Sequence, residues 1–336
     1  MKIVVDNKIP YIKDTLAKIT KDVEYLPGNE ITAEKIKDAD ALIIRTRTKC
    51  NRQLLQDSKV KFIGTATIGF DHIDTDYCKE AGITWKNCPG CNAGAVEQYV
   101  HAALELLHKE KGLVLEKACI GIVGVGHVGN RIRSLAQRMG MKVLLNDPPR
   151  EDKGEKGFVS LNTIARECDI ITFHTPLITE GKYKTYHLAD KSFFDSLNKK
   201  PVIINTSRGE VVETDSILNA INKGEVSEAI IDVWENEPHI NLELLNKVYI
   251  GTPHIAGYSA NGKFNATQMT LKSLTDFFGI DMDIDIKLPD TSDNSGTVEN
   301  KNDILLKYNP KNDYNLLLSC PEDFEKIRGN YNLRKE

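Results

Sequence analysis

Short runs of β-branched and aliphatic residues alternate with stretches of helical periodicity along most of the chain. The runs that we expect to be strands are Lys2–Asp6, Ala41–Arg45, Phe62–Ala66, Ile120–Val123, Val143–Asp147, Ile170–His174, Val202–Thr206, Ala229–Val233 and Tyr249–Thr252. Helical stretches fall between them, for example at Asp14–Ile19, Val128–Met139 and Asp215–Lys223. Most of the runs are apolar on both faces, as strands of a buried parallel sheet are. This alternation predicts βαβ units and an α/β fold of the doubly wound type.

A chain of 336 residues is longer than one ordinary core, and the pattern divides in two. We expect a first domain at 1–92 and 260–288, a second at 93–259, and a cleft between them. The long helical stretches Ala93–Glu110 and Ser259–Phe278 would join the domains, and Ile284–Leu288 would be a strand that returns to the first. Residues 289–336 form a third segment, a polar linker followed by a tail too short to fold alone.

Composition excludes several classes of protein. The formal net charge of −4 gives no reason to expect a nucleic-acid partner. The first ten residues lack the apolar stretch of a signal peptide, and no apolar run approaches the roughly 20 residues that span a bilayer. Seven irregularly spaced cysteines are typical of reduced thiols. We therefore expect a cytoplasmic protein that does not enter a membrane.

The motif Gly124-x-Gly126-x-x-Gly129 follows an apolar run and opens a helical stretch, which is the setting of a dinucleotide-binding loop. The first glycine allows the tight turn, the second allows backbone to approach the pyrophosphate, and the third allows close packing. We expect His127 and Val128 in this loop to contact the cofactor.

An acidic residue at the end of the next strand is expected to bind the cofactor's ribose. Asp147 lies 18 residues beyond Gly129 and can accept hydrogen bonds from the ribose hydroxyls. A carboxylate there would repel a 2′-phosphate and favours NAD over NADP, although Arg150 close by weakens the preference.

Three charged residues each follow a predicted strand, namely Arg208, Glu237 and His254. Ligands of open α/β sheets bind beyond the carboxyl ends of the strands. A histidine can accept a hydroxyl proton near neutral pH, and a carboxylate can orient and stabilise it. A guanidinium can hold a substrate carboxylate through two hydrogen bonds. Each residue alone is ordinarily structural, but the set behind a dinucleotide motif predicts oxidation of a 2-hydroxy acid.

The same motifs resemble the D-isomer-specific 2-hydroxyacid dehydrogenase family. They are Gly124–Gly129, Asn205–Gly209, Asp232–Pro238 and Pro253–Gly257, with Gly69–Asp74 and Cys88–Asn92 in the first domain. The resemblance covers roughly residues 1–288. It implies that Arg208 binds the substrate carboxylate, that Glu237 pairs with His254, and that His254 is the acid/base.

Further motifs resemble one branch of this family, which oxidises 4-phospho-D-erythronate in the biosynthesis of pyridoxine 5′-phosphate. They include Gly64–Gly69, Asn146–Arg150, Thr172–Leu177 and His254–Tyr258. The resemblance implies substrate contacts at Thr46, Thr67 and Tyr258. The cofactor contacts that it implies are Asp147, Thr175, Thr206, Ser207, Arg208, Asp232 and Gly257. The tail around Phe324–Tyr331 resembles part of a dimerisation domain, which implies a homodimer, although this tail is shorter than usual in the branch.

Several alternatives stay open. Arg45, Arg47 and Lys49 lie beside Thr46, and if this segment is extended they share one face. They then form either a phosphate site, with Arg45 as a ligand, or a solvated basic rim. The substrate could be another 2-hydroxy acid, such as glycerate or 3-phosphoglycerate. The protein could also be an NAD-sensing interaction protein. We interpret the Cys88-x-x-Cys91 pair as structural thiols and expect no metal.

Overall fold

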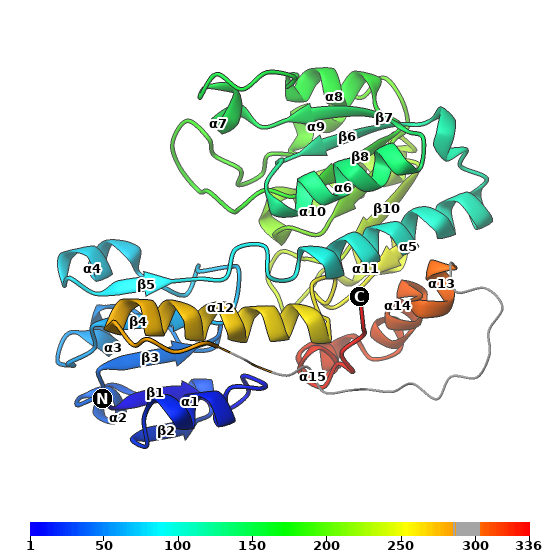
Figure 1. Ribbon diagram of the computed structural model, residues 1–336. Coiled ribbons are helices and arrows are strands. Elements are labelled where there is room, and N and C mark those ends of the chain that lie inside the picture. The colour runs from blue at the N-terminus through cyan, green and yellow to red at the C-terminus, as the bar shows by residue number, and fades with distance from the viewer. Residues whose placement is uncertain (285, 287–302) are drawn as a thin grey trace. The chain divides into compact units, whose positions relative to one another are not determined.

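The computed structural model describes residues 1–284, 286 and 303–336 (Figure 1). Their contacts divide the chain into two compact units. The first unit contains Met1–Asn92 and a stretch that begins at Ser259, and the second contains Ala93–Tyr258 and the C-terminal stretch 303–336. The sequence analysis placed the domain boundaries at 92/93 and 259/260. The predicted strand Ile284–Leu288, apart from Ile284 and Ile286, and the linker Pro289–Asn302 lie outside the described residues. The predicted cleft between the two domains stays a prediction.

The first unit is built on a five-stranded parallel sheet with the order β2-β1-β3-β4-β5. Its strands are β1 (Ile3–Asp6), β2 (Val23–Leu26), β3 (Ala41–Ile44), β4 (Phe62–Thr65) and β5 (Thr84–Lys86). Its helices are α1 (Lys13–Ile19), α2 (Ala33–Ile36), α3 (Arg52–Leu55), α4 (Thr75–Glu80) and α12 (Ala260–Phe278).

Successive strand residues of the first unit enter different apolar clusters, as the period of two in a strand requires. Ile43 packs in a cluster with Leu16 of α1 and Leu271 of α12. The neighbouring Leu42 packs in another cluster, with residues of α2, α3 and α4 such as Ile36. Helices therefore cover both faces of the sheet, which is the doubly wound arrangement.

The second unit is built on a six-stranded parallel sheet with the order β11-β10-β9-β8-β6-β7. Its strands are β6 (Cys119–Val123), β7 (Lys142–Asn146), β8 (Ile170–Phe173), β9 (Val202–Asn205), β10 (Glu228–Ile231) and β11 (Ile250–Gly251). Its helices before the tail are α5 (Ala93–Lys111), α6 (His127–Arg138), α7 (Pro148–Glu151), α8 (Leu161–Glu167), α9 (Lys191–Asp195), α10 (Thr214–Lys223) and α11 (Leu242–Lys247).

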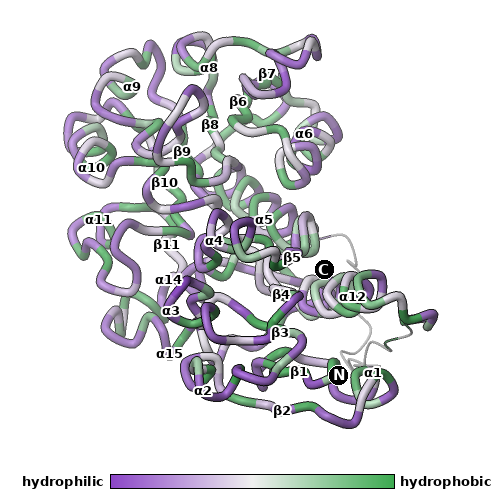
Figure 2. Tube along the Cα trace, turned by 90° about the vertical axis from the view of Figure 1, so that its left-hand side faces the viewer, coloured by the Kyte–Doolittle hydropathy of each residue, from purple (hydrophilic) through white to green (hydrophobic). Residues whose placement is uncertain are grey.

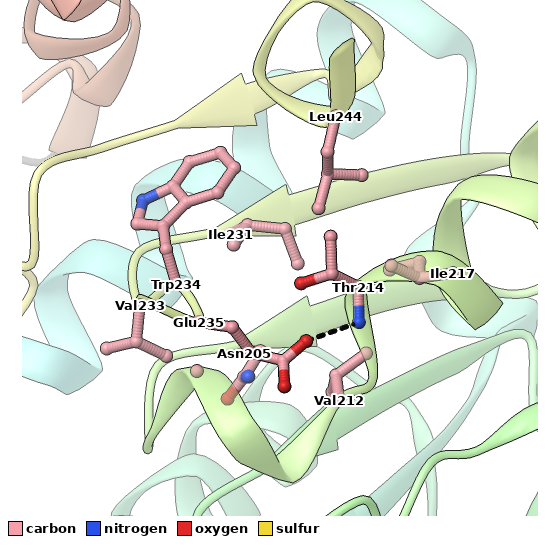
Figure 3. A pocket seen from close by; sticks show the side chains of 10 residues that line it. Asn205, Val212, Thr214, Ile217, Ile231, Val233, Trp234, Glu235 and Leu244 are labelled. Carbon is pink, nitrogen blue, oxygen red and sulfur yellow. Dashed lines mark hydrogen bonds between the residues drawn. The ribbon is translucent and has the colours of Figure 1, made fainter. Parts of the chain in front are cut away.

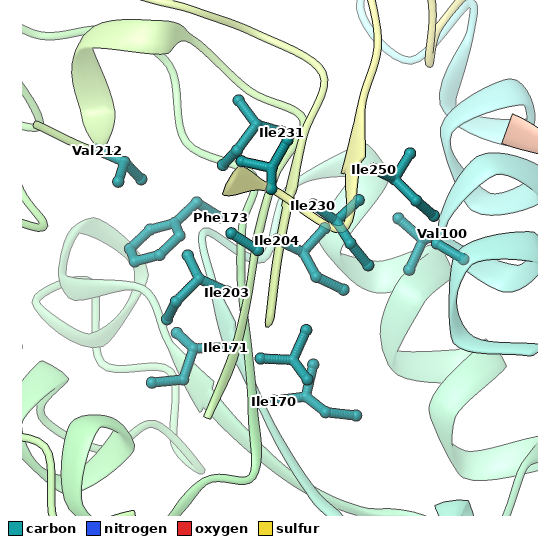
Figure 4. Close-up of a cluster of buried hydrophobic side chains, with 14 of the residues drawn as sticks. Val100, Ile170, Ile171, Phe173, Ile203, Ile204, Val212, Ile230, Ile231 and Ile250 are labelled. Atoms are coloured by element: carbon teal, nitrogen blue, oxygen red, sulfur yellow. The ribbon is translucent and has the colours of Figure 1, made fainter. Parts of the chain in front are cut away.

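Aliphatic side chains fill both faces of this second sheet (Figure 4). Ile171 and Ile203 point to the side on which Val212 lies. Ile170 points the other way, toward the side of Val100 in α5. All five side chains are buried, which explains why these strands could be predicted from their apolar character alone.

Each of the nine apolar runs predicted as strands between Lys2 and Thr252 overlaps a strand of the structure, whereas two strands of the described residues were not predicted. These are β2 and β5, the two edge strands of the first sheet. Both mix apolar and charged residues, such as Glu24 and Lys86, and neither has a buried residue. Edge strands need not be apolar on both faces, so the signal that revealed the central strands is missing from them.

The tail, which the sequence suggested was too short to fold alone, groups with the second unit. It contains α13 (Ile304–Lys307), α14 (Pro310–Ser319) and α15 (Phe324–Gly329), and it packs against α5 and β11. Tyr308, Leu317 and Phe324 are buried in the core of the unit. The Tyr314 hydroxyl donates to the carbonyls of Leu245 and Val248. A segment that buries this much apolar surface in its own chain is part of that core.

The outer helices are amphipathic. Figure 2 shows hydrophobic and hydrophilic residues alternating along α6 and α10, and their buried residues lie on one face of each helix. The longest described helices are α5 and α12. Within the described ranges, no helix combines the length and the apolar character that crossing a membrane requires.

Candidate active site

The predicted functional residues of the second unit follow its strands at the carboxyl ends. In the order of the strands from β7 to β11, they are Asp147, Gly124, Thr175, Arg208, Asp232 and His254. Because the strands are parallel, these positions lie along one edge of the sheet. The chain leaves β6 for β7 on one side and returns to β8 on the other, which makes β6 the switch point where ligands of such sheets bind.

The geometry of the glycine loop is consistent with its motif. Gly124 has a φ of +86°, a left-handed conformation that favours glycine. A Cβ on Gly129 would lie 2.1 Å from the Gly124 carbonyl oxygen, so only glycine allows α6 to pack this closely. A Cβ on Gly126 would meet no atom within 4 Å, so the space in front of the helix N-terminus is open. His127 is exposed beside this space, and Val128 is half-buried.

Asp147 and Arg150 lie next to the glycine loop. The Asp147 carboxylate accepts hydrogen bonds from the backbone N–H groups of Val125, at 2.8 Å, and Arg150, at 3.2 Å. The Arg150 guanidinium donates to Glu155 and to the Val125 carbonyl. Because Glu155 pairs with this cation, Arg150 offers a 2′-phosphate little attraction, and the arrangement favours NAD.

A second group of polar residues follows β8. The Thr175 hydroxyl is buried and has no hydrogen-bond partner within the described chain. His174 bonds the hydroxyls of Thr172, at 2.9 Å, and Thr206, at 3.3 Å. Burial lowers the pKa of His174 to about 3, so this imidazole is neutral. A buried hydroxyl without a partner is unusual in a folded protein. Together with the open space at Gly126, it fits a site that takes a polar ligand such as NAD.

Glu237 and His254 form the predicted pair. The Nδ1 atom of His254 lies 2.8 Å from one carboxylate oxygen of Glu237, and the other oxygen accepts from the backbone N–H of Trp234 at 2.9 Å. His254 has a φ of +57°, which is uncommon for a residue other than glycine, and its side chain is 27% exposed. No hydrogen bond to Nε2 of His254 occurs among the described residues, so this nitrogen can meet a ligand.

The pKa of Glu237 is lowered on balance. Burial raises it, but the attraction and hydrogen bond of His254, the N–H of Trp234 and the charge of Arg328 outweigh the burial. Glu237 is therefore a carboxylate near neutral pH. An ionised carboxylate at Nδ1 fixes the tautomer that leaves Nε2 unprotonated and stabilises the imidazolium that forms when Nε2 takes a proton.

Arg208 lies in a tightly built turn after β9. The Asn205 side chain donates to the Arg208 carbonyl at 2.9 Å and accepts from the N–H and the hydroxyl of Ser207. Ser207 is buried, so its side chain serves this turn. A Cβ on Gly209 would lie 2.0 Å from the Trp234 carbonyl carbon, which shows how closely this turn packs against the loop that carries Glu237.

Asp232 is fully buried after β10 and organises the loop of His254. Its carboxylate accepts from the Thr252 hydroxyl at 2.6 Å, the Ile255 N–H at 2.8 Å and the Ala256 N–H at 3.0 Å. Burial raises the pKa of Asp232, although His254 and these hydrogen bonds oppose the shift. Gly257, another predicted cofactor contact, follows directly and is half-buried.

The first unit carries Thr46 and Thr67 beyond the neighbouring strands β3 and β4. Thr46 is exposed. The Thr67 hydroxyl lies 2.7 Å from the Thr65 hydroxyl and donates to the Gly69 carbonyl at 2.9 Å. His72 lies 3.1 Å from the Thr65 hydroxyl, so these side chains form one polar network at the end of β4.

The basic segment after β3 differs from the prediction. Residues 46–48 form a turn and a bend, so the extended alternation that would align Arg45 with Arg47 and Lys49 is wrong. Arg45 donates two hydrogen bonds to the fully buried carboxylate of Asp6, at 3.1 and 3.2 Å. A buried carboxylate needs such a partner, and this need decides the direction of Arg45.

Tyr258 lies against the tail. Its ring meets that of Tyr331 edge to face, with centroids 6.1 Å apart, and the Arg328 guanidinium lies 5.8 Å from its centre. Arg328 also lies 4.0 Å from Glu237. The tail thus borders the loop of the predicted pair, which the sequence did not suggest.

A second pair of glutamate and histidine was not predicted. His187 lies 2.7 Å from Glu235 through Nε2 and 3.4 Å from Glu213 through Nδ1. The other oxygen of Glu235 accepts from the Thr214 N–H at 2.7 Å, beside a void of about 10 Å³ (Figure 3). His174, which bonds Thr172 and Thr206 in the group after β8, was not predicted either, although its position at the end of the predicted strand Ile170–His174 was a usable signal.

The structure describes seven free cysteines. Cys88 is buried, with its thiol near the Ala266 carbonyl and the Thr270 hydroxyl, and burial raises its pKa to about 11. Among the described residues, no three His, Cys, Asp or Glu side chains are grouped so that they could hold a metal ion.

Comparison with known sequences agrees with this geometry. Residues 94–256 match the NAD binding domain of the D-isomer specific 2-hydroxyacid dehydrogenases. The erythronate-4-phosphate dehydrogenase of Bacteroides thetaiotaomicron is 58% identical over 338 residues, which cover all of this chain and 97% of that protein. The enzyme of the same name from Escherichia coli O127:H6 is 41% identical over 349 residues, which cover all of this chain and 92% of that protein.

Solved structures of this fold include the D-lactate dehydrogenase of Aquifex aeolicus, in complex with NAD and lactic acid. It has a TM-score of 0.71 and 26% identity, covering 83% of this chain and 96% of that one. The NAD+-bound 3-phosphoglycerate dehydrogenase of Entamoeba histolytica has a TM-score of 0.70 and 26% identity, covering 85% and 98%. The chain therefore belongs to the family of the erythronate-4-phosphate dehydrogenases, which are NAD-dependent 2-hydroxyacid dehydrogenases with the D-isomer-specific NAD binding domain.

Proposed function

We propose that this protein oxidises 4-phospho-D-erythronate at C2 to 2-oxo-3-hydroxy-4-phosphobutanoate, a step in the biosynthesis of pyridoxine 5′-phosphate. The observation that carries the proposal is the Glu237–His254 pair at the carboxyl edge of the sheet. The substrate follows from the relatives of that name, which are 41% and 58% identical over the whole chain.

His254 is the base in this proposal. Its Nε2 takes the proton of the C2 hydroxyl, and Glu237 stabilises the imidazolium that results. NAD, when bound, accepts the hydride from C2. The carbon loses one hydride and the oxygen loses one proton, so the products are the ketone, NADH and the protonated histidine.

Arg208 holds the substrate carboxylate. A guanidinium can give two parallel hydrogen bonds to a carboxylate, which orients C2 as well as binding it. The hydrogen bonds of Asn205 make the turn of Arg208 rigid, and this rigidity supports the role.

The residues that we propose for NAD lie along the same edge. The glycine loop with His127 and Val128 receives the pyrophosphate at the N-terminus of α6. Asp147 binds the adenosine ribose. The remaining contacts are Thr175, Thr206, Ser207, Arg208, Asp232 and Gly257. The buried, unpartnered hydroxyl of Thr175 supports this assignment most directly.

The proposed substrate contacts are Thr46, Thr67, Arg45 and Tyr258. A phosphate is bound best by fixed donors and cations, and both hydroxyls follow strands of the first sheet. Asp6 neutralises much of the charge of Arg45, so we expect Arg45 to contribute through N–H groups that remain available rather than through net charge.

Two further proposals concern the protein in the cell. We expect a homodimer, because the tail resembles part of a dimerisation domain. We also expect the protein in the cytoplasm, where NAD and phosphorylated acids are present and free thiols such as the seven of this chain stay reduced.

The test is NAD reduction by the purified protein, followed by absorbance, with 4-phosphoerythronate set against glycerate and 3-phosphoglycerate. Each acid is assayed with and without a 2-oxo acid that reoxidises the cofactor. We expect NAD to be reduced when 4-phosphoerythronate is supplied and not when either of the other two acids is supplied. Reduction with another acid would keep the mechanism and change the substrate. Binding of NAD without reduction by any acid would contradict the proposal and favour an NAD-sensing protein.

A further inference from the structure

We propose that Arg334, in the C-terminal tail, is a positioning residue for the acid/base histidine. The proposal rests on the proposed function, in which His254 is the base. Arg334 lies outside residues 94–256, which match the NAD binding domain. No predicted site residue lies in the tail, so this inference assigns the tail a part in the active site in addition to any part in dimerisation.

The loop of His254 needs support from outside itself. A φ of +57° is costly for a histidine and persists only when the surroundings hold it. The loop follows β11, the shortest strand of the sheet and an edge strand. Regular sheet hydrogen bonding therefore gives it little restraint.

Asp232 supports this loop by accepting hydrogen bonds from the N–H groups of the loop. The Asp232 carboxylate accepts from the N–H groups of Ile255 and Ala256, and its backbone carbonyl accepts from the N–H of His254 at 2.7 Å. Three consecutive N–H groups of the loop are thus bound to one residue. On the carbonyl side, the loop itself supplies the Tyr258 N–H, which donates to the Ile255 carbonyl at 2.8 Å.

Arg334 supplies further donors to the carbonyls of this loop. Its Nη1 donates to the Ile255 carbonyl at 2.9 Å, and its Nη2 donates to the Ala256 carbonyl. The two residues that follow His254 are therefore held between a buried carboxylate and a buried guanidinium, and the peptide bond that joins them is bound by both. Because both groups act on the same two residues, a shift of either one moves the backbone of His254.

The remaining donors of Arg334 fix the guanidinium itself. Nε donates to the Gln98 side chain at 2.9 Å, Nη2 to the Ala95 carbonyl at 3.1 Å, and Nη1 to the Tyr331 hydroxyl at 3.2 Å. The guanidinium also lies 4.2 Å from the centre of the Tyr308 ring. All five N–H groups therefore have acceptors, and the cation is rigid enough to position a loop.

These acceptors distinguish the arginine from an ordinary ion pair. In the part of the chain that the structure describes, carbonyl and hydroxyl oxygens hold the guanidinium, and none of its hydrogen bonds goes to a carboxylate. Lysine keeps the charge but cannot donate in five fixed directions. The geometry of the guanidinium is therefore what the site uses.

Arg334→Lys and Arg334→Ala test the proposal, with Tyr314→Phe as the matched control. The Tyr314 hydroxyl donates to the Leu245 and Val248 carbonyls, so its loss weakens the anchoring of the tail and leaves the hydrogen bonds of Arg334 in place. We expect kcat to fall about 10- to 100-fold in Arg334→Lys, since small misplacements of a base are costly. Tyr314→Phe should stay within about threefold of the parent, and NADH affinity should hold in both.

A second measurement needs no substrate and so separates this proposal from the proposed function. The rate at which diethylpyrocarbonate modifies His254 is followed by mass spectrometry, with His187 as the internal reference. We expect the His254 rate to change by about threefold or more in Arg334→Lys while the His187 rate stays constant, because only the His254 loop loosens.

Two results would overturn the proposal. One is an equal loss of kcat in Arg334→Lys and Tyr314→Phe, which would reduce Arg334 to an anchor of the tail. The other is a parallel change of the His254 and His187 rates, which would mean general destabilisation. If Arg334→Ala does not fold, Arg334→Lys carries the test, because it keeps the buried charge.

Discussion

Two pairs of glutamate and histidine arise from one short loop of this protein. Glu237 lies 2.8 Å from His254, and Glu235 lies 2.7 Å from His187. Both histidines have positive φ, +57° and +51°, and both are about a quarter exposed. By distance, backbone and exposure the two pairs are nearly equal, yet only one of them is proposed to act in catalysis.

The difference lies in the second nitrogen of each ring. His187 has carboxylates at both nitrogens, Glu235 at Nε2 and Glu213 at Nδ1. His254 has a carboxylate at Nδ1 alone, and no hydrogen bond to its Nε2 occurs among the described residues. A ring with both nitrogens occupied holds structure together, whereas a ring with one nitrogen occupied can take a proton from a ligand.

The two carboxylates differ in the same sense. The second oxygen of Glu235 accepts from the Thr214 N–H at the first turn of α10, so this glutamate stabilises the N-terminus of that helix. The second oxygen of Glu237 accepts from the Trp234 N–H within its own loop. A glutamate–histidine pair thus indicates catalysis only when its free atoms face a ligand site.

The largest expected effect separates the two histidines. His254→Ala should lower kcat by about 10²- to 10⁴-fold, the usual scale of acid–base catalysis, and leave NAD binding intact. Steady-state kinetics and NADH fluorescence titration measure these values. His187→Ala is the matched control and should keep kcat within about threefold. Comparable losses of kcat in the two variants would contradict the assignment of a catalytic role to His254 and a structural role to His187.

The carboxylates come next. Glu237→Gln keeps an acceptor at Nδ1 but removes the charge that stabilises the imidazolium, and we expect kcat to fall about 10- to 100-fold. Glu235→Gln should leave kcat nearly unchanged. The pH profile of kcat should change shape in Glu237→Gln alone. Identical profiles for the two variants would contradict the catalytic role of Glu237 and the structural role of Glu235.

Arg208→Lys tests the third member of the set. Charge is kept while the paired hydrogen bonds to the substrate carboxylate are lost, so kcat/KM should fall by about tenfold or more. Arg166→Lys, a change of an exposed arginine in α8, is the control. Unchanged kcat/KM in Arg208→Lys would remove the carboxylate clamp from the mechanism.

The contacts of His187 with Glu235 and Glu213 are expected to contribute to the stability of the fold. His187→Gln breaks the contact with Glu235 or Glu213 and should lower the free energy of unfolding by about 1 kcal/mol, the typical net value of a part-buried hydrogen bond. Urea denaturation measures this change, with kcat as the control. A large loss of kcat without a loss of stability would indicate a catalytic role for His187.

The smallest expected effect is a loss of stability at acidic pH. Hydrogen bonds and the charges of their histidines outweigh burial and keep the pKa values of Glu235 and Glu237 below the ordinary 4.5. A lowered carboxyl pKa contributes stability above the unfolded value, and this contribution disappears as the pH falls through the folded value. Unfolding free energy should therefore decline below about pH 4.5. The decline should be shallower in Glu235→Gln, and an equal slope in that variant would contradict the shift.

Much of the fold and of the proposed site could be predicted from local patterns. Buried parallel strands are apolar on both faces, so β6 and β8 can be recognised in the sequence, whereas the edge strands β2 and β5 cannot. Residues such as Gly124 and Asp147 could be predicted as cofactor contacts because that chemistry requires a fixed spacing after a strand. The pairing of Glu237 with His254 was expected from the resemblance, and the 2.8 Å contact agrees with it.

The direction of Arg45 could not be predicted. Its residue type and neighbours suggest a basic face, but the guanidinium turns to Asp6, which lies 39 positions earlier in the chain. Only folding brings a buried carboxylate to that place. His187 was missed for the same reason, since its partners Glu235 and Glu213 follow it at distances that no local motif records.

Periodicity and short motifs were enough to predict the two α/β domains, the nucleotide loop and the chemical groups of the proposed site. The folded chain was needed to show which histidine keeps a nitrogen for a ligand, which arginine is already paired, and that Arg334 of the tail binds the loop of His254. The physical reason is that hydrogen bonds and ion pairs form between groups that are close in space. Their energies therefore depend on contacts that sequence distance does not encode.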